Sequence, residues 1–230
     1  MPVLEISKKK LNEFKKAEEY YNALRTNIQL SGSDIKIIAI TSVEPSEGKS
    51  TTSSNLAISF ARAGYRTLLL DADIRNSVMS GAFKARGKIT GLTEYLAGTA
   101  DLSQGLCDTE IENLSVITAG SMSPNPTALL QSKQFEKLMT ILHQHYDYVI
   151  VDTPPIGLVI DAAIITQNCD ASVLVTSAGS VRQKVLAKAK EQLEQTRKPF
   201  LGVILNKYNA QLDKYGAYGS YGNYGNYGKK

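Results

Sequence analysis

The chain has 230 residues, of which 43% are hydrophobic and 21% charged, and its formal net charge is +4. This composition is typical of one globular domain, and so modest a charge does not demand a nucleic-acid partner. Cys107 and Cys169 belong to no paired-thiol motif, which argues against a disulfide framework or a zinc site. No apolar run approaches the roughly 18 residues of a membrane span, and residues 1–16 are too polar for a signal peptide. We expect a soluble, cytoplasmic protein.

The first expected element is a helix over residues 11–30, within an N-terminal helical segment that covers residues 1–30. Its apolar residues fall near one helical face, and charged residues occupy the others. The apolar positions include Phe14, Ala17, Tyr21, Leu24 and Ile28. Such a helix is expected to pack on its own domain or on a neighbouring subunit.

Six apolar runs of strand length follow, and we expect them to form buried parallel strands. They span residues 35–41, 67–70, 114–118, 148–151, 172–176 and 200–205. Segments with helical spacing lie between them, at residues 51–63, 126–145 and 181–196. This alternation predicts a doubly wound α/β domain over residues 31–210, with a mostly parallel sheet flanked by helices.

A loop of small and polar residues joins the first of these strands to the following helix, in the stretch IIAITSVEPSEGKSTTSSN. This is the layout of a phosphate-binding P-loop, in which backbone N–H groups and a helix N-terminus surround phosphate oxygens. Gly48 permits the tight turn, Lys49 neutralises the β and γ oxygens, and the Ser50 hydroxyl is a ligand for Mg²⁺. The predicted nucleotide-binding residues are Glu47, Gly48, Lys49, Ser50 and Thr51.

The loop departs from the usual pattern at its start, because Val43 stands where a first glycine is usual. The alternative interpretation is therefore an ordinary helix N-terminus with a solvated lysine. Because the loop directly follows an apolar strand, the P-loop interpretation is favoured.

Two strands end in aspartates, in the stretches RTLLLDADIR and YDYVIVDTPP. Asp71, Asp73 and Asp152 should meet at the phosphates, because ligands of open α/β sheets bind beyond the carboxyl ends of the strands. Several carboxylates would repel a triphosphate unless Mg²⁺ lay between them, so the pattern implies a metal. Taken singly, each aspartate could instead be a helix cap or a turn residue.

Together the motifs EPSEGKST, LLLDADIR and VIVDTPP resemble the Walker A, Walker A′ and Walker B boxes of bacterial tyrosine kinases, and the tyrosine-rich tail completes the likeness. The resemblance covers essentially the whole chain and is strongest to the capsular polysaccharide tyrosine autokinases of streptococci. It implies a P-loop kinase that uses ATP and Mg²⁺ to phosphorylate its own tyrosines and so regulates the synthesis and export of capsular polysaccharide or exopolysaccharide.

The resemblance also implies partners and residue roles. The partners are a membrane-spanning adaptor that activates the kinase at the inner face of the cell membrane, further copies of the chain, and a cognate tyrosine phosphatase. Lys49 contacts the β and γ phosphates, Ser50 and Asp152 hold Mg²⁺, and Asp73 supports the metal shell. Asp71 is the base, because a tyrosine hydroxyl with a pKa of about 10 must lose its proton as it attacks.

Three further features follow from the resemblance. Arg75 is a candidate for charge stabilisation, and Asn206, at the end of LGVILNK, is placed to hydrogen-bond a purine. The stretch EYYNALR, from Glu19 to Arg25, partly matches a helix that builds rings of subunits, but Asn22 replaces its first arginine. The alternatives are a turn-forming asparagine and a solvated helix face.

The C-terminal segment, residues 211–230, ends in a Tyr-Gly-x repeat that cannot form a core, and we expect it to be disordered. We interpret its tyrosines as phosphoacceptors, phosphorylated in trans by a neighbouring subunit. They are Tyr215, Tyr218, Tyr221, Tyr224 and Tyr227. The alternatives are stacking on single-stranded RNA and aggregation of a low-complexity tract, and the absence of arginine after Arg197 speaks against the first.

Two other functions compete with the kinase. A ParA- or MinD-like ATPase would share the P-loop but carries a second lysine early in the loop, where this chain has Glu44. A nucleotide-gated scaffold for polysaccharide assembly would have the same motifs without phosphotransfer.

Overall fold

The computed structural model describes residues 2–85 and 89–208, which fold around one nine-stranded sheet. The strand order is β4-β1-β5-β6-β3-β7-β2-β8-β9. Every neighbouring pair from β6 to β9 is parallel, as is β1–β5, whereas β4–β1 and β5–β6 are antiparallel. The prediction of a doubly wound, mostly parallel sheet is confirmed.

The strands are β1 (Val3–Ile6), β2 (Ile37–Ser42), β3 (Thr67–Asp71), β4 (Phe83–Ala85), β5 (Leu106–Thr109), β6 (Leu114–Ile117), β7 (Tyr148–Asp152), β8 (Ala171–Ser177) and β9 (Phe200–Asn206). The helices are α1 (Lys8–Ser31), α2 (Lys49–Arg62), α3 (Leu92–Leu96), α4 (Leu102–Gly105), α5 (Pro126–Leu130), α6 (Lys133–His145), α7 (Asp161–Gln167) and α8 (Gln183–Glu194). A short 3₁₀ turn, η1, covers Met79–Gly81.

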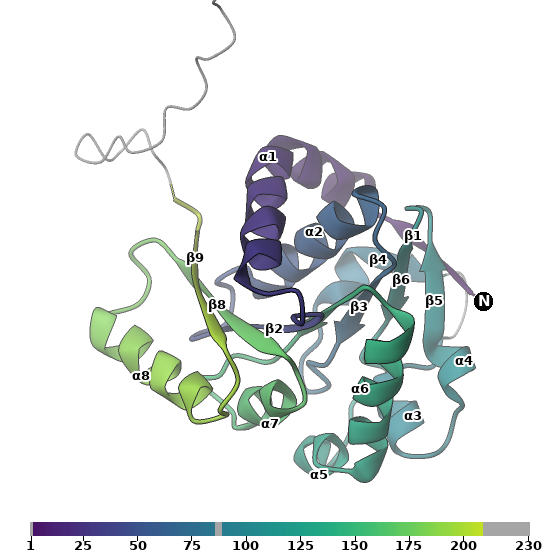
Figure 1. Cartoon of the computed structure of the whole chain (residues 1–230). Coiled ribbons are helices and arrows are strands. Elements are labelled where there is room, and N and C mark those ends of the chain that lie inside the picture. The colour runs from purple at the N-terminus through teal and green to yellow at the C-terminus, as the bar shows by residue number, and fades with distance from the viewer. Residues whose placement is uncertain (1, 86–88, 209–230) are drawn as a thin grey trace, which may run out of the picture.

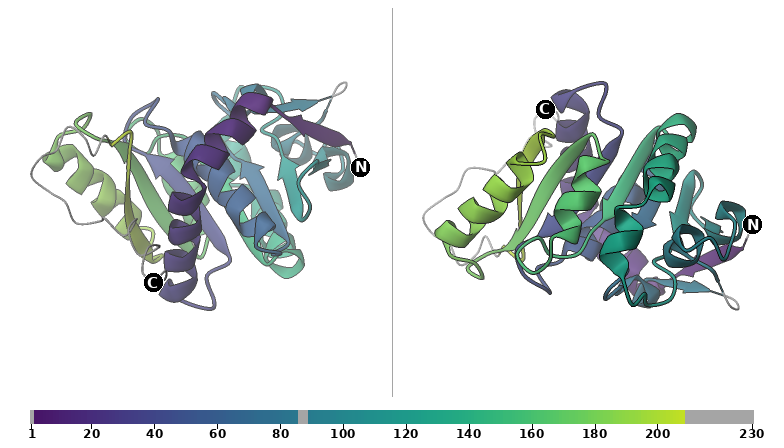
Figure 2. Two further views of the ribbon diagram at one scale, coloured as in Figure 1. Left: turned by 90° about the horizontal axis from the view of Figure 1, so that it is seen from above. Right: turned by 90° about the horizontal axis from the view of Figure 1, so that it is seen from below.

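Helices cover both faces of the sheet: α1 and α2 lie on one face, and α6, α7 and α8 lie on the other (Figure 1). Seen from above, α1 crosses the outer side of α2 (Figure 2). The N-terminal helix thus packs on its own domain, one of the two arrangements expected for it.

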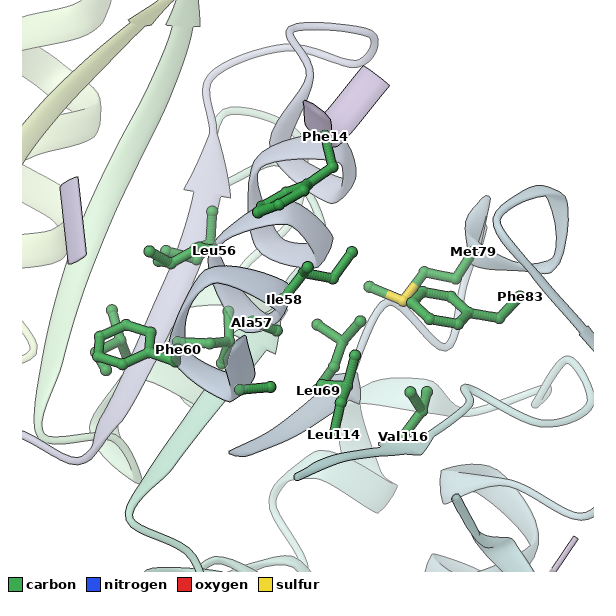
Figure 3. Close-up of a cluster of buried hydrophobic side chains, with 14 of the residues drawn as sticks. Phe14, Leu56, Ala57, Ile58, Phe60, Leu69, Met79, Phe83, Leu114 and Val116 are labelled. Atoms are coloured by element: carbon green, nitrogen blue, oxygen red, sulfur yellow. The ribbon is translucent and has the colours of Figure 1, made fainter. Parts of the chain in front are cut away.

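On the face covered by α1 and α2, the hydrophobic core joins α1 to the sheet through α2 (Figure 3). Phe14 of α1 is fully buried and points toward α2, whose Leu56 and Ile58 are also fully buried. Leu69 of β3 and Val116 of β6 continue the same cluster. Apolar burial therefore fixes α2, and with it the phosphate-binding end of α2, against the strands that carry the aspartates.

The N-terminus differs from the prediction, because β1 joins the sheet between β4 and β5. Leu4 and Ile6 alternate inward with exposed fractions of 1% and 5%. Ser7 then caps α1, its hydroxyl accepting the N–H of Lys10 at 3.2 Å, so the helix begins at Lys8 and not near residue 11.

The helix expected over residues 126–145 is divided in two. Ser132 interrupts it as the N-cap of α6, and its hydroxyl accepts the N–H of Phe135 at 3.3 Å. The sequence also did not predict the short elements α3, α4, α7, β4 and β5. Each has seven residues or fewer, so hydrophobic periodicity carries little signal in them.

Within the two described ranges, no helix has both the length and the apolar character needed to cross a membrane. The predicted acceptor tail, residues 211–230, lies outside the described residues.

We predict that Phe14→Ala lowers the free energy of unfolding by about 3–5 kcal/mol, because it empties a fully buried site between α1 and α2. Urea denaturation measures this change. Tyr20→Ala on the same helix is the control, since Tyr20 is 79% exposed, and it should change stability by no more than about 0.5 kcal/mol. Equal effects of the two substitutions would contradict the packing of α1 described above.

Candidate active site

The loop between β2 and α2 adopts the predicted tight turn. Gly48 has φ of 95°, in the left-handed region that glycine tolerates best. A Cβ atom at Gly48 would lie 1.9 Å from Nδ2 of Asn206. Glycine is therefore required here both for the turn and for the close approach of Asn206.

Packing explains why Val43 can replace the usual first glycine of the loop. Val43 is 2% exposed and belongs to a buried cluster with Ile156 and Leu174. A Cβ atom on Gly157 would lie 2.4 Å from the Val43 carbonyl oxygen. The absence of a side chain at Gly157 therefore leaves room for the start of the loop. The start of the loop is thus anchored by apolar contacts.

The Glu47 side chain ties the loop to the end of β8, a role that the sequence did not reveal. It is 2% exposed, and its carboxylate accepts five hydrogen bonds. Although burial opposes it, these hydrogen bonds hold the pKa of Glu47 below its usual value. The donors are the N–H groups of Val43, Glu44 and Ser177 and the hydroxyls of Thr176 and Ser180, at 2.7–3.2 Å.

The end of β9 supports the same loop. Asn206 donates from Nδ2 to the Glu47 carbonyl oxygen at 2.9 Å, and Lys207 donates from Nζ to the Ser46 carbonyl oxygen at 2.7 Å. Asn206 is therefore next to the P-loop, and its contact with a purine stays a prediction.

The three aspartates and the loop lysine meet, as predicted, at the carboxyl ends of the strands. Asp71 and Asp152 are direct partners in the register of β3 and β7. The Nζ atom of Lys49 lies 3.1 Å from Asp73 Oδ2, 3.5 Å from Asp152 Oδ2 and 3.2 Å from the Ser50 hydroxyl. The P-loop and both aspartate motifs thus form one site.

Burial dominates the electrostatics of this site. It raises the pKa of Asp71 to about 7, with a further contribution from the Asp152 carboxylate. Burial also raises the pKa of Asp152. For Lys49, burial acts in the opposite direction, but Asp152 and Asp73 outweigh it and raise the pKa of the ammonium group. Lys49 therefore stays positively charged, and its charge stabilises the buried carboxylates around it.

The donor atoms fit Mg²⁺, which prefers oxygen ligands and is usually held by one or two carboxylates together with substrate phosphates. Ser50 and Asp152 supply such oxygens, and the Ser53 hydroxyl orients Asp152 by donating to Oδ1 at 2.9 Å. In the described part of the chain, no group of three or more His, Cys, Asp or Glu side chains is arranged as a metal cage.

Lys10 is a further cation near the site that sequence reasoning missed. It is 5% exposed, and its Nζ atom donates to the Thr51 carbonyl oxygen at 3.2 Å. Burial lowers the pKa of Lys10 to about 8. In the sequence it is the last of three consecutive lysines, a pattern that indicates a solvated helix end and gives no sign of this contact.

Arg75 lies beside the nucleotide cleft but is held by α7 and α5. Its Nε atom is 2.5 Å from Asp161 Oδ2, and its Nη2 atom donates to the Thr127 hydroxyl at 2.8 Å. Thr127 in turn donates to Asp161 Oδ1 at 2.8 Å. Arg75 also lines the cleft that contains Lys49 and Asp73, and charge stabilisation by Arg75 stays a prediction.

In the stretch Glu19 to Arg25, which partly matches a ring-building helix, Asn22 and Arg25 make contacts within the chain. Arg25 donates from Nη1 to the Ser59 carbonyl oxygen of α2 at 2.8 Å and to Asn22 Oδ1 at 3.1 Å. Asn22 also accepts the Ser59 hydroxyl at 2.8 Å, while Glu19 is exposed. A contact of this helix with another subunit stays a prediction.

Comparisons with known proteins agree with this geometry. A family model described as an AAA domain matches residues 35–199. The tyrosine-protein kinase CpsD of Streptococcus pneumoniae is 68% identical over 216 residues, which cover 94% of this chain and 95% of that protein. The chain belongs to the bacterial tyrosine-protein kinase family.

Solved structures support the same assignment. The kinase domain of the Escherichia coli tyrosine kinase ETK is 33% identical with a TM-score of 0.81, and the match covers 87% of this chain and 79% of that one. MinD from Pyrococcus horikoshii, solved with Mg-ADP, is 26% identical with a TM-score of 0.64, and the match covers 76% and 71% of the two chains. The kinase therefore shares a P-loop fold with the ATPases that competed with it in the sequence analysis.

We predict that Glu47→Gln weakens nucleotide binding by about tenfold or more, because the amide NH₂ would face donors that now bond to a carboxylate oxygen. Isothermal titration with a magnesium nucleotide measures the affinity. The control is Glu44→Gln in the same loop, whose side chain is exposed and which should bind nucleotide as the unchanged chain does. Unaltered binding by Glu47→Gln would show that the loop does not depend on this carboxylate.

Proposed function

We propose that the kinase transfers the γ-phosphate of ATP, with Mg²⁺, to the tyrosines of its own C-terminal tail, in trans between copies of the chain. The observation that carries this proposal is the convergence of Lys49, Asp73 and Asp152 at 3.1–3.5 Å, with Asp71 beside them. The tyrosine-kinase family of the chain supports a protein tyrosine as the acceptor.

The proposed roles are those that the resemblance to bacterial tyrosine kinases implies, and the geometry of the site supports them. Lys49 binds the β and γ phosphates, and Ser50 and Asp152 hold Mg²⁺, supported by Asp73. The metal, when bound, neutralises charge on the phosphates and on the aspartates. Asp71 takes the proton of the tyrosine hydroxyl as the phenolic oxygen bonds to the γ phosphorus, while the bond from that phosphorus to the bridging oxygen breaks and ADP leaves. Glu47, Gly48 and Thr51 belong to the loop that surrounds the phosphates, and Asn206 contacts the purine ring of the nucleotide.

The acceptor side of the proposal rests on the repeat in residues 215–227, which places a tyrosine at every third position between glycines and small residues. Each phosphate adds roughly −1.5 to −2 charges near neutral pH. Several phosphates would therefore reverse the positive charge of residues 211–230, whose charged residues are Asp213, Lys214, Lys229 and Lys230. The tail would act as a charge switch on contacts between subunits.

The proposed location and partners are those that the resemblance to bacterial tyrosine kinases implies. We place the kinase at the inner face of the cell membrane, bound and activated by a membrane-spanning adaptor of the polysaccharide co-polymerase type, and opposed by a cognate tyrosine phosphatase. Its output would regulate the synthesis and export of capsular polysaccharide or exopolysaccharide. Association of copies, stable or transient, provides the acceptor in trans.

A ParA- or MinD-like ATPase and a nucleotide-gated scaffold are the competing functions from the sequence analysis, and the 68% identity to a tyrosine-protein kinase favours the kinase over both. Glu44 weighs against the first, because its exposed carboxylate stands where such ATPases carry a lysine. Measuring ATP turnover and tail phosphorylation in one preparation, with and without Lys49→Met, separates the three. Turnover without phosphotyrosine would favour the ATPase, and nucleotide binding without turnover would favour the scaffold.

We predict that Asp71→Asn retains ATP binding but reduces phosphotransfer by about 10²- to 10⁴-fold, because a general base acts on the transition state more than on the bound substrate. Transfer of radiolabelled phosphate and calorimetric titration measure the two effects. Phosphorylation at the unchanged rate would exclude Asp71 as the base.

We predict that replacing all five tail tyrosines with phenylalanine leaves the melting temperature and ATP binding unchanged and removes most phosphotyrosine. The tail follows the last strand, and its hydroxyl groups are the proposed acceptors. Phosphopeptide mapping provides the measurement. Label found mainly at Tyr95 or Tyr146 would show that the tail is not the acceptor.

A further inference from the structure

The proposed base, Asp71, is closed to an incoming acceptor. Its side chain is 0% exposed, its Oδ1 atom accepts the N–H of Asp73 at 3.2 Å, and its Oδ2 atom accepts the hydroxyl of Ser77. A general base must come within hydrogen-bond reach of the proton that it removes. Ser77 thus holds a hydroxyl group where a tyrosine hydroxyl would have to be.

The backbone directs the Ser77 proton toward Asp71. The Ser77 oxygen accepts the N–H of Met79 at 3.2 Å, and Met79 begins the 3₁₀ turn η1. A hydroxyl has one proton and two acceptor lone pairs, so the oxygen that accepts from Met79 still donates its proton to the carboxylate. The contact is therefore built into the turn.

The Ser77–Met79 segment also borders two cavities. The nucleotide cleft, of about 520 Å³, is lined by Lys49, Asp73 and Val78, among others. A second cavity, of about 540 Å³, is lined by Asp71 together with Ser77 and Met79. Val78 borders the first cavity and its two neighbours border the second, so this segment contributes to the lining of both the nucleotide cleft and the space beside Asp71.

The second cavity suits the side chain of a tyrosine. Apolar lining is contributed by Leu4, Phe83 and Ile89, and Met79 and Phe83 belong to one buried cluster (Figure 3). A phenol has an apolar ring and a polar tip that needs a hydrogen-bond partner when buried. Asp71 is among the residues that line this cavity and can be that partner.

We propose that Ser77 is a positioning residue that occupies the acceptor's place at Asp71, and that a tail tyrosine displaces its hydroxyl before phosphotransfer. This inference rests on the proposed function. The tyrosine hydroxyl replaces the Ser77 hydroxyl as the donor to Asp71, and then gives up its proton as its oxygen attacks. Until an acceptor arrives, Ser77 keeps water from the base and so limits hydrolysis of ATP.

Ser77→Ala and Ser77→Thr test this role in the full chain carrying the five tail phenylalanine substitutions, with a soluble Tyr-Gly-x peptide as acceptor. For Ser77→Ala we expect the KM for the peptide to fall by about tenfold, the value of one hydrogen bond to a charged group, while the KM for ATP is unchanged. ATP hydrolysis without peptide should rise, because water gains access to Asp71. Ser77→Thr keeps the hydroxyl and should behave as the unchanged residue does.

Ser132→Ala is the matched control, since it also removes a serine hydroxyl that bonds to a backbone N–H, but at the start of α6. It should lower stability without changing either KM. An unchanged or higher peptide KM in Ser77→Ala, with no rise in ATP hydrolysis, would overturn the inference. If Ser77 chiefly activated the base, Ser77→Ala would lower the rate of transfer at saturating peptide, which also contradicts it.

The same assay separates this inference from the proposed function. If the chain with Ser77 phosphorylates the peptide and Asp71→Asn does not, the proposed function stands, and the Ser77→Ala result decides the inference alone. If the chain with Ser77 labels neither the peptide nor, with its five tail tyrosines restored, its own tail, the proposed function fails and the inference fails with it. If it labels the restored tail but not the peptide, the proposed function stands, and the failure of a free tyrosine segment to reach Asp71 overturns the inference.

Discussion

Two carboxylates on neighbouring strands create the constraint on which this site depends. Asp71 and Asp152 are paired in register, and both are almost fully buried. Like charges placed side by side away from water are costly, and Asp73 adds a third carboxylate. Lys49 is the cation that contacts two of them, and its position is fixed because it is the first residue of α2. The contacts around the loop serve to hold that lysine in place.

The support for Lys49 comes from three directions. The Glu47 carboxylate ties the loop to β8, apolar packing anchors Val43, and α1 presses on the outer side of α2. These contacts explain how a P-loop without its first glycine keeps a defined shape. They also explain why α1 belongs to the catalytic domain in physical terms, since Lys10 and Arg25 both donate to carbonyl groups of α2.

Sequence reasoning was strongest where one local pattern determined both structure and chemistry. The parallel strands were predictable because runs such as residues 67–70 are apolar on both faces, and the aspartates that follow them could only lie at one edge of the sheet. The meeting of Lys49 with Asp73 and Asp152 followed from that geometry. Strand β1 was missed because its four residues are stabilised by β4 and β5, which are distant in sequence.

The roles of Glu47 and Lys10 could not be predicted for a related reason. A charged side chain in a polar stretch of sequence is usually solvated, and only the tertiary partners reveal that these two are buried. For Glu47, three of the five partners are more than 120 residues away, in and just after β8. The Ser77 contact with Asp71 is close in sequence, but it depends on a turn for which periodicity gives no signal.

The end of β9 connects the C-terminal tail to the phosphate-binding loop. Asn206 and Lys207 donate to consecutive carbonyl groups of the phosphate-binding loop, and the tyrosine repeat begins only eight residues after Lys207. Moving the chain at Lys207 would break its hydrogen bond to the Ser46 carbonyl oxygen, in the loop that holds Lys49. Under the proposed function, a subunit would therefore offer its tail through a segment that also supports its own nucleotide site, and this would couple the giving and the receiving of phosphate within one molecule.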